Sequence, residues 1–179
     1  MKRYLGIALV VLALTATATQ PAAAQDTPPP AAILPPAGNV LAFSLLADGD
    51  RIYVCAAGAG GELGWVSRGP DAMLTNRLGD EVGRYAAGPT WSAVDGSSMR
   101  GEMRQSMDAP RRRSTPWLLF EASSRSASGV FSSVSYVQEV QTNGGAEPQE
   151  PCTQSQSGQE RRVEFTALYH FFIPSGSTP

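Results

Sequence analysis

The amino-acid sequence predicts an all-β fold, an antiparallel β-sandwich or barrel-like single domain of about nine to ten short strands. Apolar residues recur at every second position in most segments, which is typical of strands with one buried face. Turn signals rich in glycine separate these segments at short intervals. Runs with helical periodicity are hard to find, and the only helix candidate, around residues 70–74, is a single turn.

The last predicted strand shows the alternation most clearly. In residues 162–172 one face is apolar, and its members are Val163, Phe165, Ala167, Tyr169 and Phe171. Residues 98–107 alternate methionine and glycine with charged side chains in the same way. Further strands are predicted where β-branched and aromatic residues are enriched, over residues 40–46, 51–57, 117–122 and 130–140.

Turns are predicted at dipeptides and tripeptides whose residues suit a positive φ or a fixed turn. These are Asp48-Gly49, Arg68-Gly69-Pro70, Leu78-Gly79-Asp80, Asp95-Gly96 and Asn143-Gly144-Gly145. The glycine-rich residues 58–64 are interpreted as a hairpin loop. They do not match a dinucleotide-binding fingerprint, because Leu63 stands where a glycine is needed and a strand follows instead of a helix.

The first residues have the organisation of a secretory signal peptide. A positive start precedes an apolar run and the sequence Ala22-Ala23-Ala24, which fits an A-x-A cleavage site. The apolar run is shorter than the roughly 20 residues of a membrane-spanning helix. We predict a signal peptide over residues 1–24, cleaved after Ala24, a Pro/Ala-rich tether over 25–38, a β domain over 39–174 and a flexible tail over 175–179. The mature protein is expected to be periplasmic or secreted.

Charge and cysteine content narrow the function classes. The chain has 14 basic and 16 acidic residues, and removal of the signal peptide would make the balance more acidic, so neither nucleic acid nor an acidic membrane is an expected partner. Cys55 and Cys152 are predicted to form a structural disulfide, because the chain leaves the reducing cytosol. One histidine and two cysteines are too few for a usual zinc site, and we expect no metal or cofactor. The arginines at 111–113 are interpreted as a solvated turn, with an anion contact as the alternative.

A series of motifs runs along the chain in a definite order. It comprises Ile52-Tyr53-Val54-Cys55, Trp65-Val66, Pro70-Asp71-Ala72, Gly79, Val82-Gly83, Tyr85-Ala86-Ala87-Gly88-Pro89-Thr90-Trp91, Asp95-Gly96-Ser97, Ala109-Pro110, Pro116-Trp117-Leu118-Leu119, Gly129-Val130-Phe131, Tyr136-Val137-Gln138, Thr142-Asn143-Gly144-Gly145, Pro148, Cys152 and the aromatic residues 165–172. The order resembles the domain of unknown function family 3455, a group of small exported bacterial and fungal proteins. The resemblance covers nearly all of the chain after the tether, and it implies no activity, because the family has none established.

Two positions depart from the pattern of that family. The family usually has a histidine where Arg84 stands and an aspartate where Leu168 stands, and an extra alanine at 86 or 87 alters the spacing. Any chemistry that the histidine or the aspartate performs in relatives would be lost in this chain.

Residues 83–97 are the strongest candidate for a ligand-binding surface. Tyr85 and Trp91 offer aromatic faces, and Arg84 and Asp95 supply charges, which together suit a sugar or another small polar ligand. The alternative is that Trp91 lies in the core, and its exposure separates the two hypotheses. The function predicted on this basis is an exported, non-catalytic binding or envelope-stress module whose partner is an unidentified small molecule or glycan, with no prediction of oligomeric state.

A periplasmic carbohydrate-active hydrolase is the alternative function. It would use Asp95 or Glu102, or Asp80 with Glu81, but the separation of two carboxyl groups that such enzymes need is not visible in a sequence. The only histidine, His170, lies on the polar face of the last strand, and the chain has no Gly-x-Ser-x-Gly motif. We therefore expect no catalytic residues.

Overall fold

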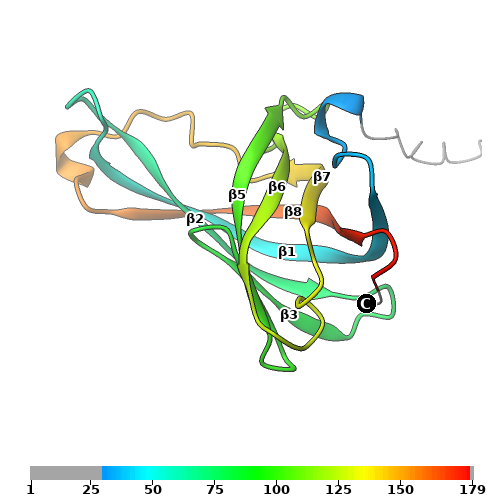
Figure 1. Ribbon diagram of the computed structural model, residues 1–179. Helices are drawn as coiled ribbons and strands as arrows, with labels where there is room; N and C mark the ends of the chain where they lie inside the picture. The colour runs from blue at the N-terminus through cyan, green and yellow to red at the C-terminus, as the bar shows by residue number, and fades with distance from the viewer. Residues whose placement is uncertain (1–29, 178–179) are drawn as a thin grey trace, which may run out of the picture.

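A computed structural model of the protein describes residues 30–177. One antiparallel sheet closes on itself, since each strand pairs with the next and the last pairs with the first (Figure 1). The strands are β1 (Asn39–Ala57), β2 (Leu63–Thr75), β3 (Glu81–Ala86), β4 (Thr90–Ala93), β5 (Ser98–Met107), β6 (Trp117–Arg125), β7 (Tyr136–Gly144) and β8 (Glu160–Pro174). The all-β antiparallel prediction is confirmed, in its barrel form. The predicted signal peptide lies outside the described residues.

The barrel has eight strands, fewer than predicted, because two expected turns lie inside long strands. Asp48-Gly49 lies within β1, which pairs there with β2 on one side and β8 on the other. A Cβ on Gly49 would lie 2.3 Å from the Asp71 carbonyl oxygen, so this glycine permits a close approach of two strands and does not make a turn. Gly69, at φ +106°, lies in β2 opposite an irregularity in the pairing with β1.

The one helix candidate, residues 70–74, is part of strand β2, because these residues pair with residues 47–51 of β1. Ala72 and Leu74 are buried and alternate with more exposed neighbours, as a strand requires. The strand expected over residues 130–140 begins only at Tyr136, after a turn. The turns at Gly79 and Gly96 are confirmed, and both glycines have a positive φ.

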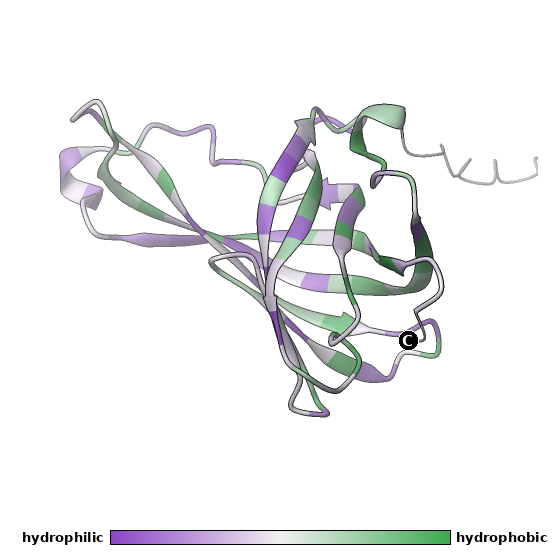
Figure 2. Ribbon diagram, viewed as in Figure 1, coloured by the Kyte–Doolittle hydropathy of each residue, from purple (hydrophilic) through white to green (hydrophobic). Residues whose placement is uncertain are grey.

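Aromatic side chains fill the barrel interior, which at eight strands is just wide enough for side chains to occupy. The inward face predicted for β8 is confirmed in the barrel, where Phe165, Ala167, Tyr169 and Phe171 are all buried. Hydrophobic and hydrophilic residues alternate along the strands (Figure 2). The largest fully buried side chains of this core are Trp91, Tyr85, Tyr169, Phe120, Phe131, Phe165 and Phe171.

A short 3₁₀ helix, η1 (Ala31–Ile33), covers the outer side of the barrel near β7. Ile33 is fully buried against Trp117 and Val140, and its carbonyl accepts a 2.7 Å hydrogen bond from the Gln138 side chain. The second half of the predicted tether is therefore packed against the domain at this point, because one isoleucine supplies the apolar contact that the surrounding prolines lack.

Strands β1, β2 and β8 continue beyond the barrel as a three-stranded arm, visible on the left of Figure 1. We define the arm as residues 53–69 and 146–163. Its apolar cluster is small and separate from the barrel core, and it consists of Tyr53, Cys55, Trp65 and Cys152 with Leu63 and Val163 at the margin. A second 3₁₀ helix, η2 (Gln154–Gln156), lies in the segment that returns to β8.

Candidate functional site

Tyr85 and Trp91 face the barrel interior from the hairpin of β3 and β4. The two residues are direct neighbours in the strand pairing, and their rings stack at 4.8 Å between centroids. Trp91 has no exposed surface and Tyr85 has 1 %, and Trp91 also meets Phe120 and Tyr169 edge to face. Their contacts are those of core residues, which is the alternative that the sequence left open.

Arg84 and Asp95 lie outside the barrel. Arg84 donates a 2.6 Å hydrogen bond to Asp71, and this contact, with a second from Arg162, holds the pKa of Asp71 below its ordinary value. The Asp95 carboxylate accepts hydrogen bonds from the Ser97 side chain and from the backbone amides of Ser97 and Val130. The structure therefore does not bring Arg84, Tyr85, Trp91 and Asp95 together on one exposed surface.

The carboxylates proposed for hydrolysis have local partners. Hydrogen bonds, first from the Ser97 hydroxyl and then from the Val130 amide, lower the pKa of Asp95, so it is an ionised turn-forming group. Glu102 is exposed on β5 and pairs with Arg104 at 3.0 Å. Asp80 accepts a 2.9 Å hydrogen bond from Asn76 within a turn. These contacts are those of turns and of an exposed strand surface.

His170 contacts Ser44 across the pairing of β1 with β8, with 2.7 Å between Ser44 Oγ and His170 Nδ1. Burial lowers the pKa of His170, and the cation of Arg77 adds to this shift. Among residues 30–177 no carboxylate makes a hydrogen bond to His170, so the third member of a triad is missing there.

A buried ion pair lies inside the barrel, and sequence reasoning missed it. Arg51 of β1 and Glu139 of β7 meet at 2.5 Å, with 11 % and 0 % of their side chains exposed. The Arg51 guanidinium lies 4.7 Å from the ring centre of Phe165 and 5.8 Å from that of Tyr85. A charged residue two positions after Val137, on the face where strand alternation places Val137, was the signal that could have revealed it.

Several polar side-chain atoms in the barrel interior lack a hydrogen-bond partner within residues 30–177. Four of these atoms are buried without a hydrogen bond of good geometry to any group of residues 30–177: Arg51 Nε, Glu139 Oε2, the Tyr169 hydroxyl oxygen and Trp91 Nε1. Burial, together with the charge of Glu139, raises the pKa of the Tyr85 and Tyr169 hydroxyls, which therefore stay protonated. Burial also raises the pKa of the Glu139 carboxyl, and Arg51 opposes that shift.

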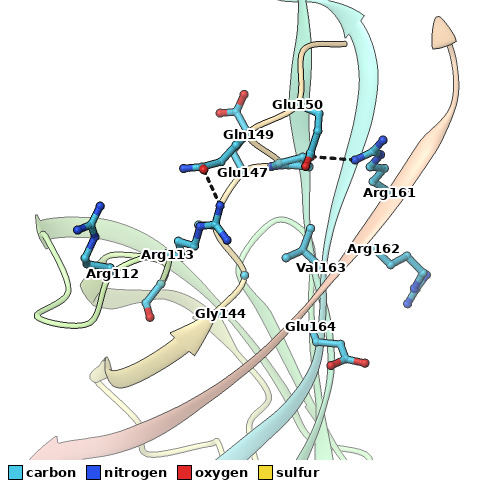
Figure 3. Close-up of a pocket in the computed structure, with 14 residues that line it drawn as sticks. Arg112, Arg113, Gly144, Glu147, Gln149, Glu150, Arg161, Arg162, Val163 and Glu164 are labelled. Carbon is cyan, nitrogen blue, oxygen red and sulfur yellow. Dashed lines mark hydrogen bonds and ion pairs between the residues drawn. The ribbon is translucent and has the colours of Figure 1, made fainter.

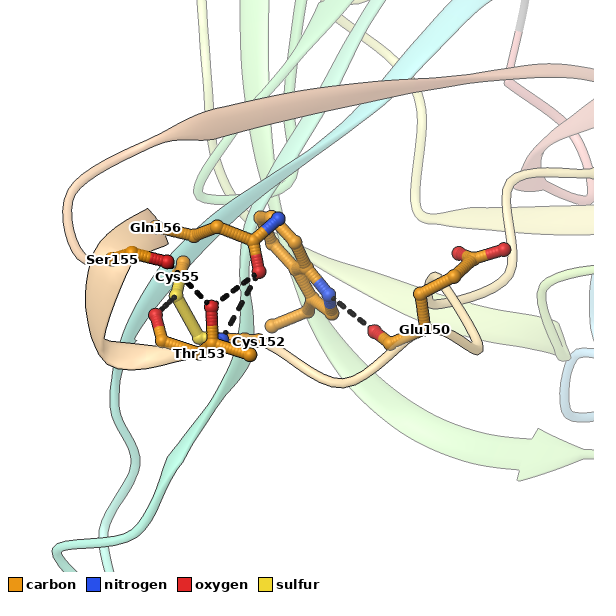
Figure 4. The surroundings of a disulfide bond; sticks show 7 residues. Cys55, Glu150, Cys152, Thr153, Ser155 and Gln156 are labelled. Carbon is orange, nitrogen blue, oxygen red and sulfur yellow. Dashed lines mark hydrogen bonds between the residues drawn. A yellow bond between two sulfur atoms is a disulfide. The ribbon is translucent and has the colours of Figure 1, made fainter.

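The disulfide between Cys55 and Cys152 joins β1 to the segment before β8, as predicted (Figure 4). Around it, Trp65 Nε1 donates a 2.8 Å hydrogen bond to the Glu150 carbonyl, and the Arg161 guanidinium lies 4.8 Å from the Trp65 ring centre. Thr153 caps η2 through a reciprocal hydrogen bond with Gln156. These contacts hold the segment of residues 150–156 against β1 and β2.

An open groove lies where the arm meets the barrel (Figure 3). Its volume is about 1180 Å³, and its walls are the segment of residues 144–150, the loop of residues 112–114 and residues 161–164 of β8. Its lining includes charged and amide side chains but no aromatic one. The groove is therefore polar, and its chemistry differs from the aromatic surface that the sequence suggested.

Two cations of the groove have no carboxylate partner. None of the ion pairs formed within residues 30–177 includes Arg112 or Arg113. Arg113 has a φ of 61°, a conformation that non-glycine residues seldom adopt, and its guanidinium donates a 2.5 Å hydrogen bond to Gln149. Arg161 on the other wall is already paired with Glu150 at 3.2 Å. The free positive charge is thus concentrated at residues 112–113.

The part of the chain that the structure describes contains no group of three or more His, Cys, Asp or Glu side chains arranged to hold a metal ion. In the same residues, no helix is long and apolar enough to cross a membrane.

Comparison with known proteins gives a family and no activity. The family model described as "Protein of unknown function (DUF3455)" matches residues 36–173, which run from before β1 to the next-to-last residue of β8. No curated protein and no solved structure matches the chain. The match spans well over half of the sequence, and the chain therefore belongs to the DUF3455 family of proteins of unknown function.

Proposed function

We propose that this protein is an exported, non-catalytic binding module whose ligand-binding surface is the groove between the arm and the barrel. The ligand is extended and carries carboxylate groups. The observation that carries the proposal is that Arg112 and Arg113, on the wall of an open groove, form no ion pair within residues 30–177.

The chemistry of arginine supports this ligand class. A guanidinium group binds a carboxylate through paired hydrogen bonds in a fixed plane, and an unpaired guanidinium has donors to offer. The hydrogen bond from Arg113 to Gln149 uses only part of this capacity and holds the side chain in place. The groove has no aromatic side chain on which an uncharged sugar would stack, which favours charged ligands over neutral glycans.

A binding role is favoured over hydrolysis because the candidate acids and bases are engaged elsewhere. Asp95 holds a turn, Glu102 pairs with a surface arginine and His170 has a serine but no carboxylate beside it. Export is supported by the disulfide, because such bonds persist in oxidising compartments.

Calorimetric titration of the oxidised protein tests the proposal. We expect polyglutamate and oligogalacturonate to bind, and polyglutamine and a neutral glucan to bind weakly or not at all. The double substitution Arg112→Ala and Arg113→Ala should weaken binding of the acidic probes by about tenfold or more, as expected for lost charge-assisted hydrogen bonds.

Arg68→Ala combined with Arg77→Ala is the matched control, because it removes the same charge from residues that do not line the groove. Added salt should weaken binding, since the contacts are electrostatic. Equal losses in the two double variants would mean that only net charge matters, and the groove would not be the site.

A further inference from the structure

One edge of β8 is unpaired where it borders the groove. Strand β7 pairs with β8 only as far as Gly144 opposite Phe165, and the segment after Gly144 leaves the sheet. From Val163 to Glu160, β8 keeps a single partner, β1. The arm therefore has a sheet edge that the closed barrel does not have.

The pairing with β1 decides which backbone groups face this edge. The Cys55 amide donates to the Gln159 carbonyl, and the Gly145 amide donates to the Glu164 carbonyl from the opposite side. Because backbone groups alternate in direction along an antiparallel strand, those of Glu160 and Arg162 point away from β1, as those of Glu164 do. Within residues 30–177 the backbone groups of Glu160 and Arg162 have no backbone partner on that side.

The segment opposite this edge is held at both ends. Near the barrel, Gly145 donates its amide to β8 and accepts a 2.7 Å hydrogen bond from the Tyr53 hydroxyl. Near the tip, the Glu150 carbonyl is bound by Trp65, and Cys152 is bonded to Cys55. Between these anchors the segment runs along the far side of the groove from β8 (Figure 3). Between the anchors, residues 146–150 form no strand pairing with β8.

We propose that the free edge of β8 binds an extended acidic peptide as an additional strand. This inference rests on the function proposed above and names the ligand as a polypeptide. Backbone groups of Glu160 and Arg162 pair with the backbone of the peptide, and glutamate or aspartate side chains of the peptide pair with Arg112 and Arg113. Strand addition of this kind derives affinity from backbone hydrogen bonds and specificity from alternate side chains.

A short peptide of alternating glutamate and valine is the probe. Two versions carry N-methyl groups on alternate amides, one version on each edge of the peptide. An added strand uses one edge only, so one version should lose binding by about tenfold or more and the other should bind like the parent peptide. Binding is measured by calorimetry with the oxidised protein.

A pair of protein variants provides the second test. Arg162→Pro removes the amide that faces the groove and is compatible with an edge position, whereas Arg162→Ala keeps the amide and removes the same ion pairs with Asp50 and Asp71. We expect Arg162→Pro to bind the parent peptide about tenfold more weakly than Arg162→Ala does. Circular dichroism and thiol titration confirm that both variants are folded and oxidised.

The outcomes separate the two proposals. If the two methylated peptides bind equally, or if oligogalacturonate binds while the peptide does not, strand addition is overturned and the groove remains an anion site. If no acidic probe binds, the function proposed above fails as well. Loss of binding with one methylated peptide only, together with the effect of Arg162→Pro, supports strand addition.

Discussion

The barrel and the arm share three strands but are stabilised in different ways. In the barrel, every strand has two neighbours and aromatic side chains fill the interior. In the arm, β1 lies between β2 and β8, whose outer edges have no strand partner within residues 30–177, and a small cluster contains the disulfide. Where the sheet no longer closes around a core, little apolar area is left to bury, and a covalent link between β1 and the segment before β8 accompanies the small cluster.

The largest expected effect is in the barrel. Glu139→Leu leaves the Arg51 cation buried without a partner, and we expect a loss of about 3–5 kcal/mol in the free energy of unfolding. Arg51→Met combined with Glu139→Leu should recover most of it. Urea denaturation measures both, and the exposed pair Arg104 and Glu121 is the matched control, whose replacement should cost less than about 1 kcal/mol.

The second effect concerns the arm. Replacing Cys55 and Cys152 by serine should cost about 2–4 kcal/mol, because the disulfide constrains a long loop of the unfolded chain. Hydrogen exchange should rise first in residues 145–159, while amides around Tyr169 in the barrel stay protected. Equal acceleration of exchange in both regions would show that the arm and the barrel form one cooperative unit.

A smaller effect on stability is expected from alanine substitutions at two glycines that do not have a positive φ, Gly49 and Gly60. Gly49→Ala places a Cβ against the Asp71 carbonyl and Ala72 in the barrel, and we expect a loss of about 1–3 kcal/mol in thermal or urea unfolding. Gly60→Ala at the tip of the arm meets no atom within 4 Å and should change stability by about 0.5 kcal/mol or less. Similar losses at both sites would argue against tight strand contact at Gly49.

The smallest effect lies at the turn between β4 and β5. The pKa of Asp95 is lower in the folded protein than the roughly 3.9 of a free aspartate, so its contribution to stability is complete above that pH and is lost as the pH falls further. Asp95→Asn should remove this part of the acid dependence. The midpoint of acid unfolding, followed by tryptophan fluorescence, would be unchanged by the substitution if the hydrogen bonds of Asp95 contributed nothing.

The sequence predicted those parts of the fold that depend on local patterns. Alternation in residues 162–172 gave the correct inward face, and the pairing of Cys55 with Cys152 followed from the count of cysteines. Turn propensity failed at Asp48-Gly49, because a glycine that allows two strands to approach looks the same in sequence as a glycine that turns the chain. Only the register of β1 with β2 distinguishes the two cases.

The candidate site was harder to predict, because it depends on contacts between distant segments. Tyr85 and Trp91 have the composition of a ligand surface, yet the closure of the barrel places both inside. Arg51 and Glu139 are 88 residues apart, and nothing local to either indicates the other. The groove likewise arises because β7 ends at Gly144, whereas β8 extends further into the arm. This difference appears only when the lengths of the two paired strands are compared.

The pairing of β1 with β8 has a consequence for the order of folding. The first strand of the barrel, β1, pairs with the last strand, β8, along most of its length, from Asn39 opposite Pro174 to Val54 opposite Glu160. Until the final strand has been synthesised, β1 can acquire only β2 as a neighbour, and the aromatic interior stays open to water. Pairing β1 with β8 closes a loop that contains all the strands between them. Because closing a long loop costs entropy before the stabilising contacts form, we expect barrel closure to be a late and slow step in folding.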